Sequence, residues 1–114
     1  VHTFSVLGIA YWWMGIYGIA VAWFSYVWVY NSGDAVDSIC HLFGSRPYSN
    51  DSQLATNSLI MALITFGDGW HNNHHFYPKS ARHGFKPLEI DTSFYLILIL
   101  NKIGIIDQFY LPPK

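Results

Sequence analysis

The long uncharged stretch at the start of the chain constrains its fold more than any other feature. Residues 1–33 contain no Asp, Glu, Lys or Arg. One helix over residues 4–30 would be about 40 Å long, which exceeds the hydrocarbon core of a bilayer, about 30 Å thick. The glycines of the GIYG segment, residues 15–18, offer a break. The sequence therefore predicts the end of one spanning helix over residues 1–13 and a second helix from residue 16 onward.

Composition also indicates a membrane protein. The chain is 52% hydrophobic and only 11% charged, whereas soluble domains carry about 25% charged residues. The aromatic content of 18% suits rings that lie at membrane interfaces. A net charge of -1 with six Lys and Arg residues argues against nucleic acid as a partner, because a phosphate backbone requires a basic surface. Cys40 stands alone, which excludes an intramolecular disulfide and suits a small buried residue.

Three histidines within five positions, in the segment HNNHH, give the strongest indication of a functional site in this sequence. His71, His74 and His75 stand at i, i+3 and i+4, so a helix places their imidazoles on one face. Neutral imidazole suits iron, copper, zinc and nickel, and one helix cannot supply a whole coordination shell. An exposed polar cluster is the alternative. The flanking aromatic residues and the membrane character argue against it, because ionisable groups in membranes are costly and usually functional.

The second apolar helix is predicted to continue out of the bilayer through Asp34, Asp37 and His41, the last two sharing a face. A polar, turn-rich surface loop is expected over residues 44–56. Residues 57–66 then form an apolar helical run of about ten residues, too short to span a membrane.

Capping residues give the remaining boundaries. Asp68 is predicted to cap the histidine helix, with the orientation of an imidazole as its alternative role. Pro78 disfavours helical geometry at the preceding residue and so ends this helix. Asp91 or Thr92 caps a last helix, for which the interruption at residues 101–104 favours an interfacial position over a span.

These motifs carry a family resemblance. HNNHH, preceded by GDGW and followed by YPKSARHG, resembles the third histidine box of membrane fatty-acid desaturases. The similarity extends through DSICHLFGSRPY and EIDTSFYLILILNKIGIID, over roughly residues 15–111, and is strongest to the stearoyl (Δ9) type that acts on acyl-CoA or acyl lipids. It implies an all-α fold in which integral membrane helices are followed by a cytosolic helical metal-binding cap. Residues 1–114 would be the C-terminal part of one desaturase domain, with 1–33 transmembrane and 34–114 holding the metal-site portion.

The resemblance also implies a site. Its metal ligands are His41, His71, His74 and His75, and the residues expected behind these ligands are Asp37, Asp68 and His83. Asp37 departs from the family pattern, which usually has an asparagine that reaches a metal through water. An aspartate there takes the same role more strongly, enters the coordination shell, or faces solvent.

The implied activity is oxidation of a saturated acyl chain to a cis double bond, at the Δ9 position, with two iron ions, O2 and an external donor such as ferredoxin or cytochrome b5. The substrate would be an acyl-CoA, an acyl-carrier protein conjugate or an acyl lipid. The protein would be a multi-pass membrane enzyme, and the basic segment 79–86 puts its metal site on the cytoplasmic side. Two further histidine boxes of the family would lie upstream of Val1, so we expect this polypeptide alone to be inactive.

Two alternatives stay open, and a third, a purely structural membrane subunit, leaves the clustered imidazoles unexplained. Related membrane hydroxylases and ketolases, acting on fatty acids or alkanes, use a similar centre, and histidine spacing does not separate them from desaturases. The flanking CHLFGSRPY and SARHG segments favour desaturation. A non-catalytic haem-binding membrane anchor would need one histidine from each of two facing helices, which a cluster on one short segment fits less well.

Overall fold

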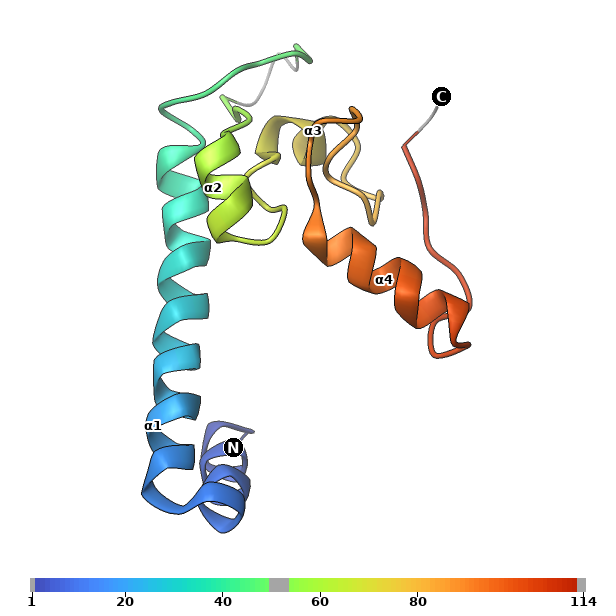
Figure 1. Cartoon of the computed structure of the whole chain (residues 1–114). Coiled ribbons are helices and arrows are strands. Elements are labelled where there is room, and N and C mark those ends of the chain that lie inside the picture. Colours follow the sequence, from blue (N-terminus) through green and yellow to red (C-terminus); the bar gives the residue numbers. More distant parts are fainter. Residues whose placement is uncertain (1, 50–53, 113–114) are drawn as a thin grey trace. The chain divides into compact units, whose positions relative to one another are not determined.

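The computed structural model of the chain describes residues 2–49 and 54–112. Four helices follow one another in this part of the chain: α1 (His2–Ile39), α2 (Leu59–Ile64), α3 (His71–Phe76) and α4 (Thr92–Lys102) (Figure 1). The described residues form no strand, only isolated antiparallel bridges that join Asn57 to Ser45 and to Trp70. The predicted helical class is therefore confirmed. The chain divides into two compact units, Val1–Asp34 and Ala35–Lys114.

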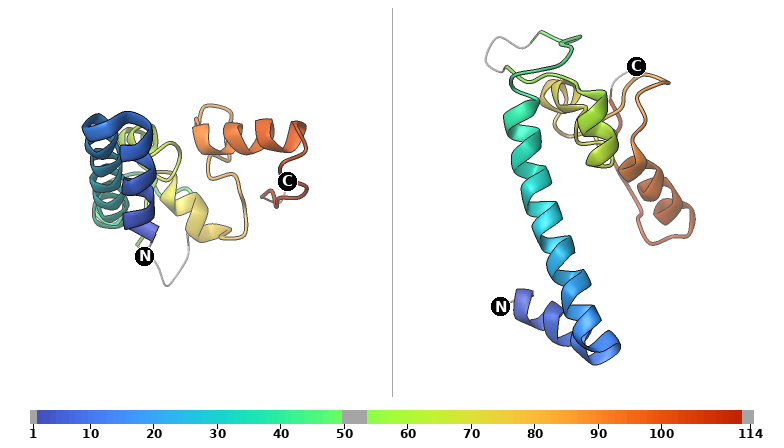
Figure 2. Two further views of the ribbon diagram at one scale, coloured as in Figure 1. Left: turned by 90° about the horizontal axis from the view of Figure 1, so that it is seen from below. Right: turned by 60° about the vertical axis from the view of Figure 1, so that its left-hand side comes forward.

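The first unit is a helix that folds back on itself. Gly15 interrupts α1 with φ 61° and ψ −142°, a backbone conformation open to glycine but strained for other residues. The two legs then approach closely (Figure 2), and a Cβ atom at Gly18 would overlap the carbonyl group of Ala10. The Thr3 hydroxyl lies 3.2 Å from the Tyr26 hydroxyl, so a second contact joins the two legs farther from the turn. The predicted break within residues 15–18 is confirmed.

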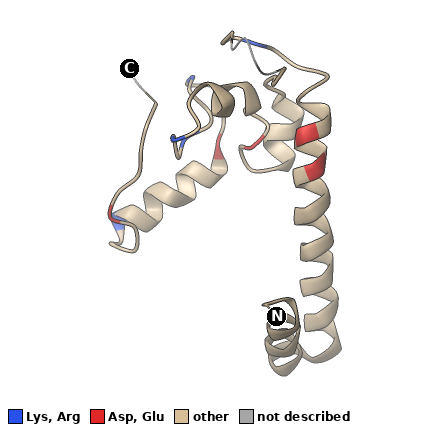
Figure 3. Cartoon of the chain, turned by 180° about the vertical axis from the view of Figure 1, so that it is seen from behind, with Lys and Arg blue, Asp and Glu red and all other residues tan. Residues whose placement is uncertain are grey.

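Apolar side chains of α1 lie on the surface of the first unit. Trp12 is 86% exposed and Phe4 is 81% exposed, and no acidic or basic residue interrupts this surface before Asp34 (Figure 3). By length and composition, α1 is suited to cross a membrane.

The second unit begins with the last turn of α1. Val36 and Cys40 are buried there and pack with Met61. The helix ends at Ile39, because the backbone N–H and the side-chain hydroxyl of Thr56 both donate to the Cys40 carbonyl, at 2.6 and 2.8 Å. Asp37 is therefore helical as predicted. The prediction that the helix includes His41 is wrong, since this residue lies in the turn that follows.

The segment leading to the histidines is less regular than predicted. Residues 50–53 of the expected surface loop lie outside the described part of the chain, but Ala55 and Thr56 are buried, so that end of the segment is not a surface loop. The apolar run forms only the six residues of α2, capped by the Ser58 hydroxyl, which accepts from the Met61 N–H.

The ends of the last two helices agree with their sequence signals. Tyr77, before Pro78, has φ −137° and stops α3. The Asp91 carboxylate accepts from the Phe94 N–H at 2.9 Å and caps the start of α4. At 11 residues, α4 is about 16 Å long and too short to span a bilayer.

Candidate metal centre

Close backbone packing places α3 against α2. A Cβ atom at Gly69 would overlap the backbone of Met61 and Ala62, so only glycine allows this approach. The Gly69 carbonyl accepts from the Ser58 N–H at 2.8 Å. On the other side, the Trp70 indole donates to the Ile90 carbonyl at 2.7 Å. The start of the histidine helix is thus fixed between two other segments.

The two asparagines between the histidines attach α3 to its surroundings. The Asn72 amide donates to the carbonyls of Tyr48 and Ala55, at 2.9 and 3.0 Å, and accepts from the Tyr48 N–H. The Asn73 amide donates to the His83 carbonyl at 2.7 Å and accepts from the Asn57 amide at 2.6 Å. Both asparagines are fully buried, so they hold the histidines in register with the loops around them.

Buried carboxylates organise the loop that follows α3. One oxygen of Glu89 accepts from the Asn73 amide and from the backbone N–H groups of Phe85 and Lys86, at 2.8 to 3.0 Å. One oxygen of Asp91 accepts from the His83 and Gly84 N–H groups. Because buried carboxylates are stable only when well hydrogen-bonded, these contacts favour one loop conformation.

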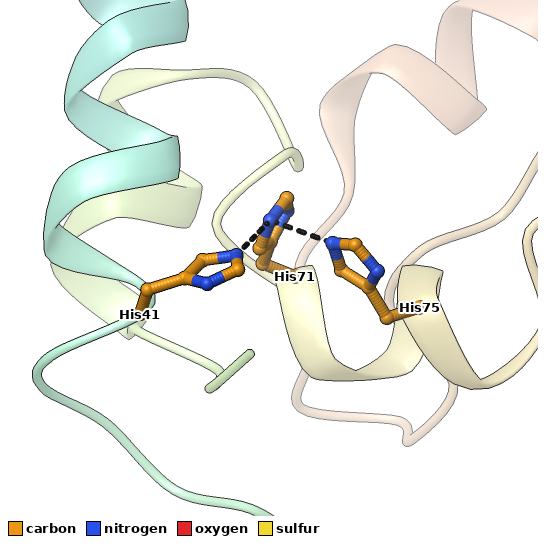
Figure 4. A group of neighbouring side chains, drawn as sticks. All are labelled: His41, His71 and His75. Atoms are coloured by element: carbon orange, nitrogen blue, oxygen red, sulfur yellow. Dashed lines mark hydrogen bonds between the residues drawn. The ribbon is translucent and has the colours of Figure 1, made fainter. Parts of the chain in front are cut away.

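Three imidazoles from two segments converge on one point. His71 and His75 project from α3 and His41 from the turn after α1 (Figure 4). The His71 Nε2 atom lies 2.9 Å from the His75 Nε2 atom and 3.2 Å from the His41 Nε2 atom. These three residues form a group that could hold a metal ion.

The separations within this group suit a common metal ion. Two ligand atoms that each lie about 2.1 Å from a metal are about 3.0 Å apart at a right angle and about 3.4 Å apart at a tetrahedral angle. One imidazole nitrogen carries either a proton or a lone pair, so hydrogen bonds alone cannot pair all three nitrogens. A cation would accept all three lone pairs, and the donor set fits iron, zinc or copper.

The surroundings favour the neutral form of His71 and His75. The pKa of His71 is lowered from 6.5 to about 4. Burial is the largest cause, and electrostatic repulsion from His75 and His41 adds to it. Burial also lowers the pKa of His75, with His41 as a further cause. Neutral imidazole is the form that binds metals, so these residues are ready to act as ligands near pH 7.

His74 is not a member of the three-nitrogen group, although its ring centroid lies 5.6 Å from that of His75. Its ring centroid is 4.6 Å from that of His83, and its Nδ1 atom is buried without a hydrogen-bond partner among the described residues. His83 in turn lies 3.4 Å from an Asp68 carboxylate oxygen. The prediction that Asp68 caps α3 is wrong, since the cap position belongs to Trp70 with no side-chain hydrogen bond. Asp68 instead contacts an imidazole, and this hydrogen bond lowers the pKa of its carboxyl group.

Asp37 lies in the last turn of α1, next to His71 of the three-nitrogen group. Its Oδ1 atom lies 3.7 Å from the His71 Nε2 atom, and its side chain is 78% exposed. The remaining predicted residues thus fall into two neighbourhoods, Asp37 near the group and His83 with Asp68 near His74.

Sequence reasoning missed the residues that hold the site. Asn72, Asn73, Glu89 and Asn57 make the buried hydrogen bonds described above. The position of two asparagines within HNNHH was the available signal, because asparagine is unfavourable inside helices unless its side chain has a partner.

Comparisons with known proteins identify the relatives of this chain. It is 44% identical over 91 residues to an icosanoyl-CoA 5-desaturase of Limnanthes douglasii, which covers 80% of this chain and 25% of the relative. It is 40% identical over 101 residues to an sn-1 stearoyl-lipid 9-desaturase of Synechocystis, which covers 88% of this chain and 29% of the relative. A palmitoyl-monogalactosyldiacylglycerol delta-7 desaturase of Arabidopsis thaliana is 39% identical over 77% of this chain and 24% of the relative.

The chain spans about a quarter of the length of these curated relatives. No family model matches it, and no solved structure does. The relatives are named for acyl-CoA and acyl-lipid substrates and for desaturation at positions 5, 7 and 9. They therefore share a class of reaction but differ in the position of the double bond. The resemblance seen in the histidine box is therefore confirmed: the curated relatives of this chain are acyl-CoA and acyl-lipid desaturases.

Proposed function

We propose that this chain forms part of the iron centre of an O2-dependent fatty-acid desaturase. The observation that carries the proposal is the convergence of the Nε2 atoms of His41, His71 and His75 in a chain related to desaturases. An unactivated methylene group requires an oxidant that no side chain provides. Bound iron would supply that oxidising power with O2 and two external electrons.

The protein residues have positioning roles in this proposal. His41, His71 and His75 hold one iron ion, and burial of His71 keeps protons from competing for its nitrogen. His74 serves a second iron ion with its free ring nitrogen. The buried Nδ1 atom of His74 supports this role, because a buried polar atom without a partner is costly unless something binds it. His83, whose ring lies next to that of His74, and Asp68, which contacts His83, orient His74.

We place the complete enzyme in a membrane. α1 would cross the bilayer, since its exposed apolar surface suits lipid or other helices. The residues from 34 onward would form the cytosolic metal-site portion. The positive-inside tendency and the basic residues Lys79, Arg82 and Lys86 support a cytoplasmic location.

The substrate would be a saturated acyl chain on CoA or on a lipid, as the names of the relatives suggest. A ferredoxin or cytochrome b5 would deliver the electrons. We propose the Δ9 position for the double bond. Relatives named as 9-desaturases support this position, and relatives named for positions 5 and 7 mark the competing outcomes.

A chimera tests this function. The chain replaces the matching 101-residue stretch of the Synechocystis sn-1 stearoyl-lipid 9-desaturase, and the chimera is expressed in a desaturase-deficient, iron-replete host. We expect a cis-monoene in the host lipids. Changing His41, His71, His74 or His75 to Ala should remove the product at least a hundredfold, because each change deletes one metal ligand.

The control is His2→Ala, which removes an exposed histidine far from this cluster in the sequence. This variant should retain activity. An alcohol instead of an alkene would assign the chain to the hydroxylases. A monoene that persists in all four ligand variants would disprove the proposed site.

A further inference from the structure

We infer that Asp37 is a direct ligand of the metal ion held by His41, His71 and His75, which gives a site of three nitrogens and one carboxylate oxygen. The inference rests on the proposed metal site and deepens it. It differs from a role in which Asp37 is a solvated acid that acts through water or through space.

The first argument is geometric. His71 Nε2 is the atom on which the group is centred: it lies 2.9 and 3.2 Å from the two other imidazole nitrogens. The Asp37 Oδ1 atom lies 3.7 Å from the same His71 nitrogen. Ligand atoms bound to one ion would be about 3.0 to 3.4 Å apart. A shift of a few tenths of an ångström brings the carboxylate within this range of the His71 nitrogen. Among the described residues, the group whose ligand atoms all lie within 4.8 Å of one another contains the three histidines alone, so a common ion also requires the Asp37 side chain to rotate toward the other two nitrogens.

The second argument concerns freedom of movement. The backbone around Asp37 is fixed, because Val36 is 5% exposed and Cys40 is fully buried in the core of the second unit. The Asp37 side chain is 78% exposed. The helix thus presents a carboxylate beside the His71 nitrogen and leaves it free to rotate toward an ion.

The third argument is chemical. Imidazoles are neutral ligands, so three of them leave the full charge of a divalent ion uncompensated in a site where His71 is only 8% exposed. A carboxylate ligand supplies one negative charge directly. Histidine combined with carboxylate is a ligand set of non-haem iron sites. Asp37 would therefore favour iron over softer ions that prefer nitrogen or sulfur.

The test uses the full 114-residue chain in detergent and Co2+ as the probe, because cobalt reports its ligands through visible absorption. Asp37→Asn keeps the shape of the side chain and removes its charge. Asp34→Asn is the matched control, since it makes the same charge change on the same helix, upstream of the group. Circular dichroism verifies that each variant keeps the helicity of the original chain.

We expect Asp37→Asn to weaken Co2+ binding by tenfold or more and to shift the cobalt absorption band. Asp34→Asn should leave both unchanged, and Asp37→Glu should restore part of the affinity. A ligand acts through its bond to the metal, so the spectral change is the decisive readout. A purely electrostatic effect would lower the affinity without moving the band.

Other results would overturn the inference. Unchanged affinity and absorption in Asp37→Asn would show that the carboxylate does not bind the ion. Equal losses in the Asp34 and Asp37 variants, with one common spectrum, would assign the effect to charge alone. His71→Ala separates the two proposals: loss of Co2+ binding in that variant but not in Asp37→Asn would retain the histidine site and reject Asp37. Absence of Co2+ binding by the unmodified chain would reject both.

Discussion

At the residue scale, His71 determines how the site responds to pH. Its pKa falls from 6.5 to about 4 in the folded chain, so the unfolded chain binds more protons between these values. The free energy of unfolding of the metal-free chain should therefore decrease as the pH falls from 6.5 toward 4. Above pH 6.5, where His71 is neutral in both the folded and the unfolded chain, no stability is lost through this residue. Thermal unfolding in detergent at pH 7.5 and pH 5, followed by circular dichroism, measures the effect.

NMR of labelled histidine provides the matching assay for His71. Its ring signals should stay at their neutral position down to about pH 5. The variant His71→Gln removes the titrating group, so its unfolding should depend less on pH. A His71 ring that titrates near 6.5 would contradict this prediction.

Sequence predicted the residues with distinctive chemistry better than those with structural roles. The spacing of His71, His74 and His75 predicted all three on one face of a helix. In α3, His71 and His75 meet His41 in the three-nitrogen group, and His74 does not. The partners of Asn72 and Asn73 lie as many as 24 positions away, so the local sequence indicates that these amides need partners but does not identify the partners. The cap assigned to Asp68 failed for the same reason, because His83 competes for this carboxylate from a distant segment.

At the scale of elements, the contact between α2 and α3 depends on Gly69. A methyl group there would overlap the backbone of Met61 and Ala62, so Gly69→Ala should push the histidine helix away from its support. We expect a loss of Co2+ affinity of at least tenfold and a lower melting temperature.

Gly33→Ala is the control for this prediction. Its added methyl group meets nothing within 4 Å, and alanine favours a helix by about 1 kcal/mol over glycine. The control should bind Co2+ normally and melt no lower than the original chain. Equal behaviour of the two alanine variants would show that close packing at Gly69 is unimportant.

The elements themselves were predictable to different degrees. Gly15 marked the break in α1 because few residues adopt its backbone conformation, and Asp91 marked the start of α4 through a local cap. The length of α2 was overestimated. Its apolar run continues to Phe66, but Phe66 and Gly67 adopt φ of 59° and 128° and turn the chain toward α3. This turn is stabilised by the Thr92 hydroxyl and the Ser93 N–H, which donate to the Phe66 carbonyl.

At the scale of the whole molecule, the exposed apolar surface of α1 suits a membrane, and we expect stable membrane insertion. The chain expressed in cells should remain in the membrane pellet after alkaline carbonate extraction. Phe24→Lys, midway along residues 16–33, should reduce the resistant fraction, because a charge in the middle of a spanning segment costs about 3 kcal/mol. Ser38→Lys, near the end of α1, is the control and should remain in the pellet. Complete extraction of the original chain would rule out a spanning α1.

The polar interior of the second unit affects its thermodynamics. Its largest fully buried side chains include two amides, and Glu89 and Asp91 are buried nearby. Exposure of apolar surface raises the heat capacity on unfolding, whereas exposure of polar surface lowers it. We therefore expect the second unit to have a small heat-capacity increment for its size and a stability that varies gently with temperature. At low temperature, the fold that holds the histidines would then lose little of its stability.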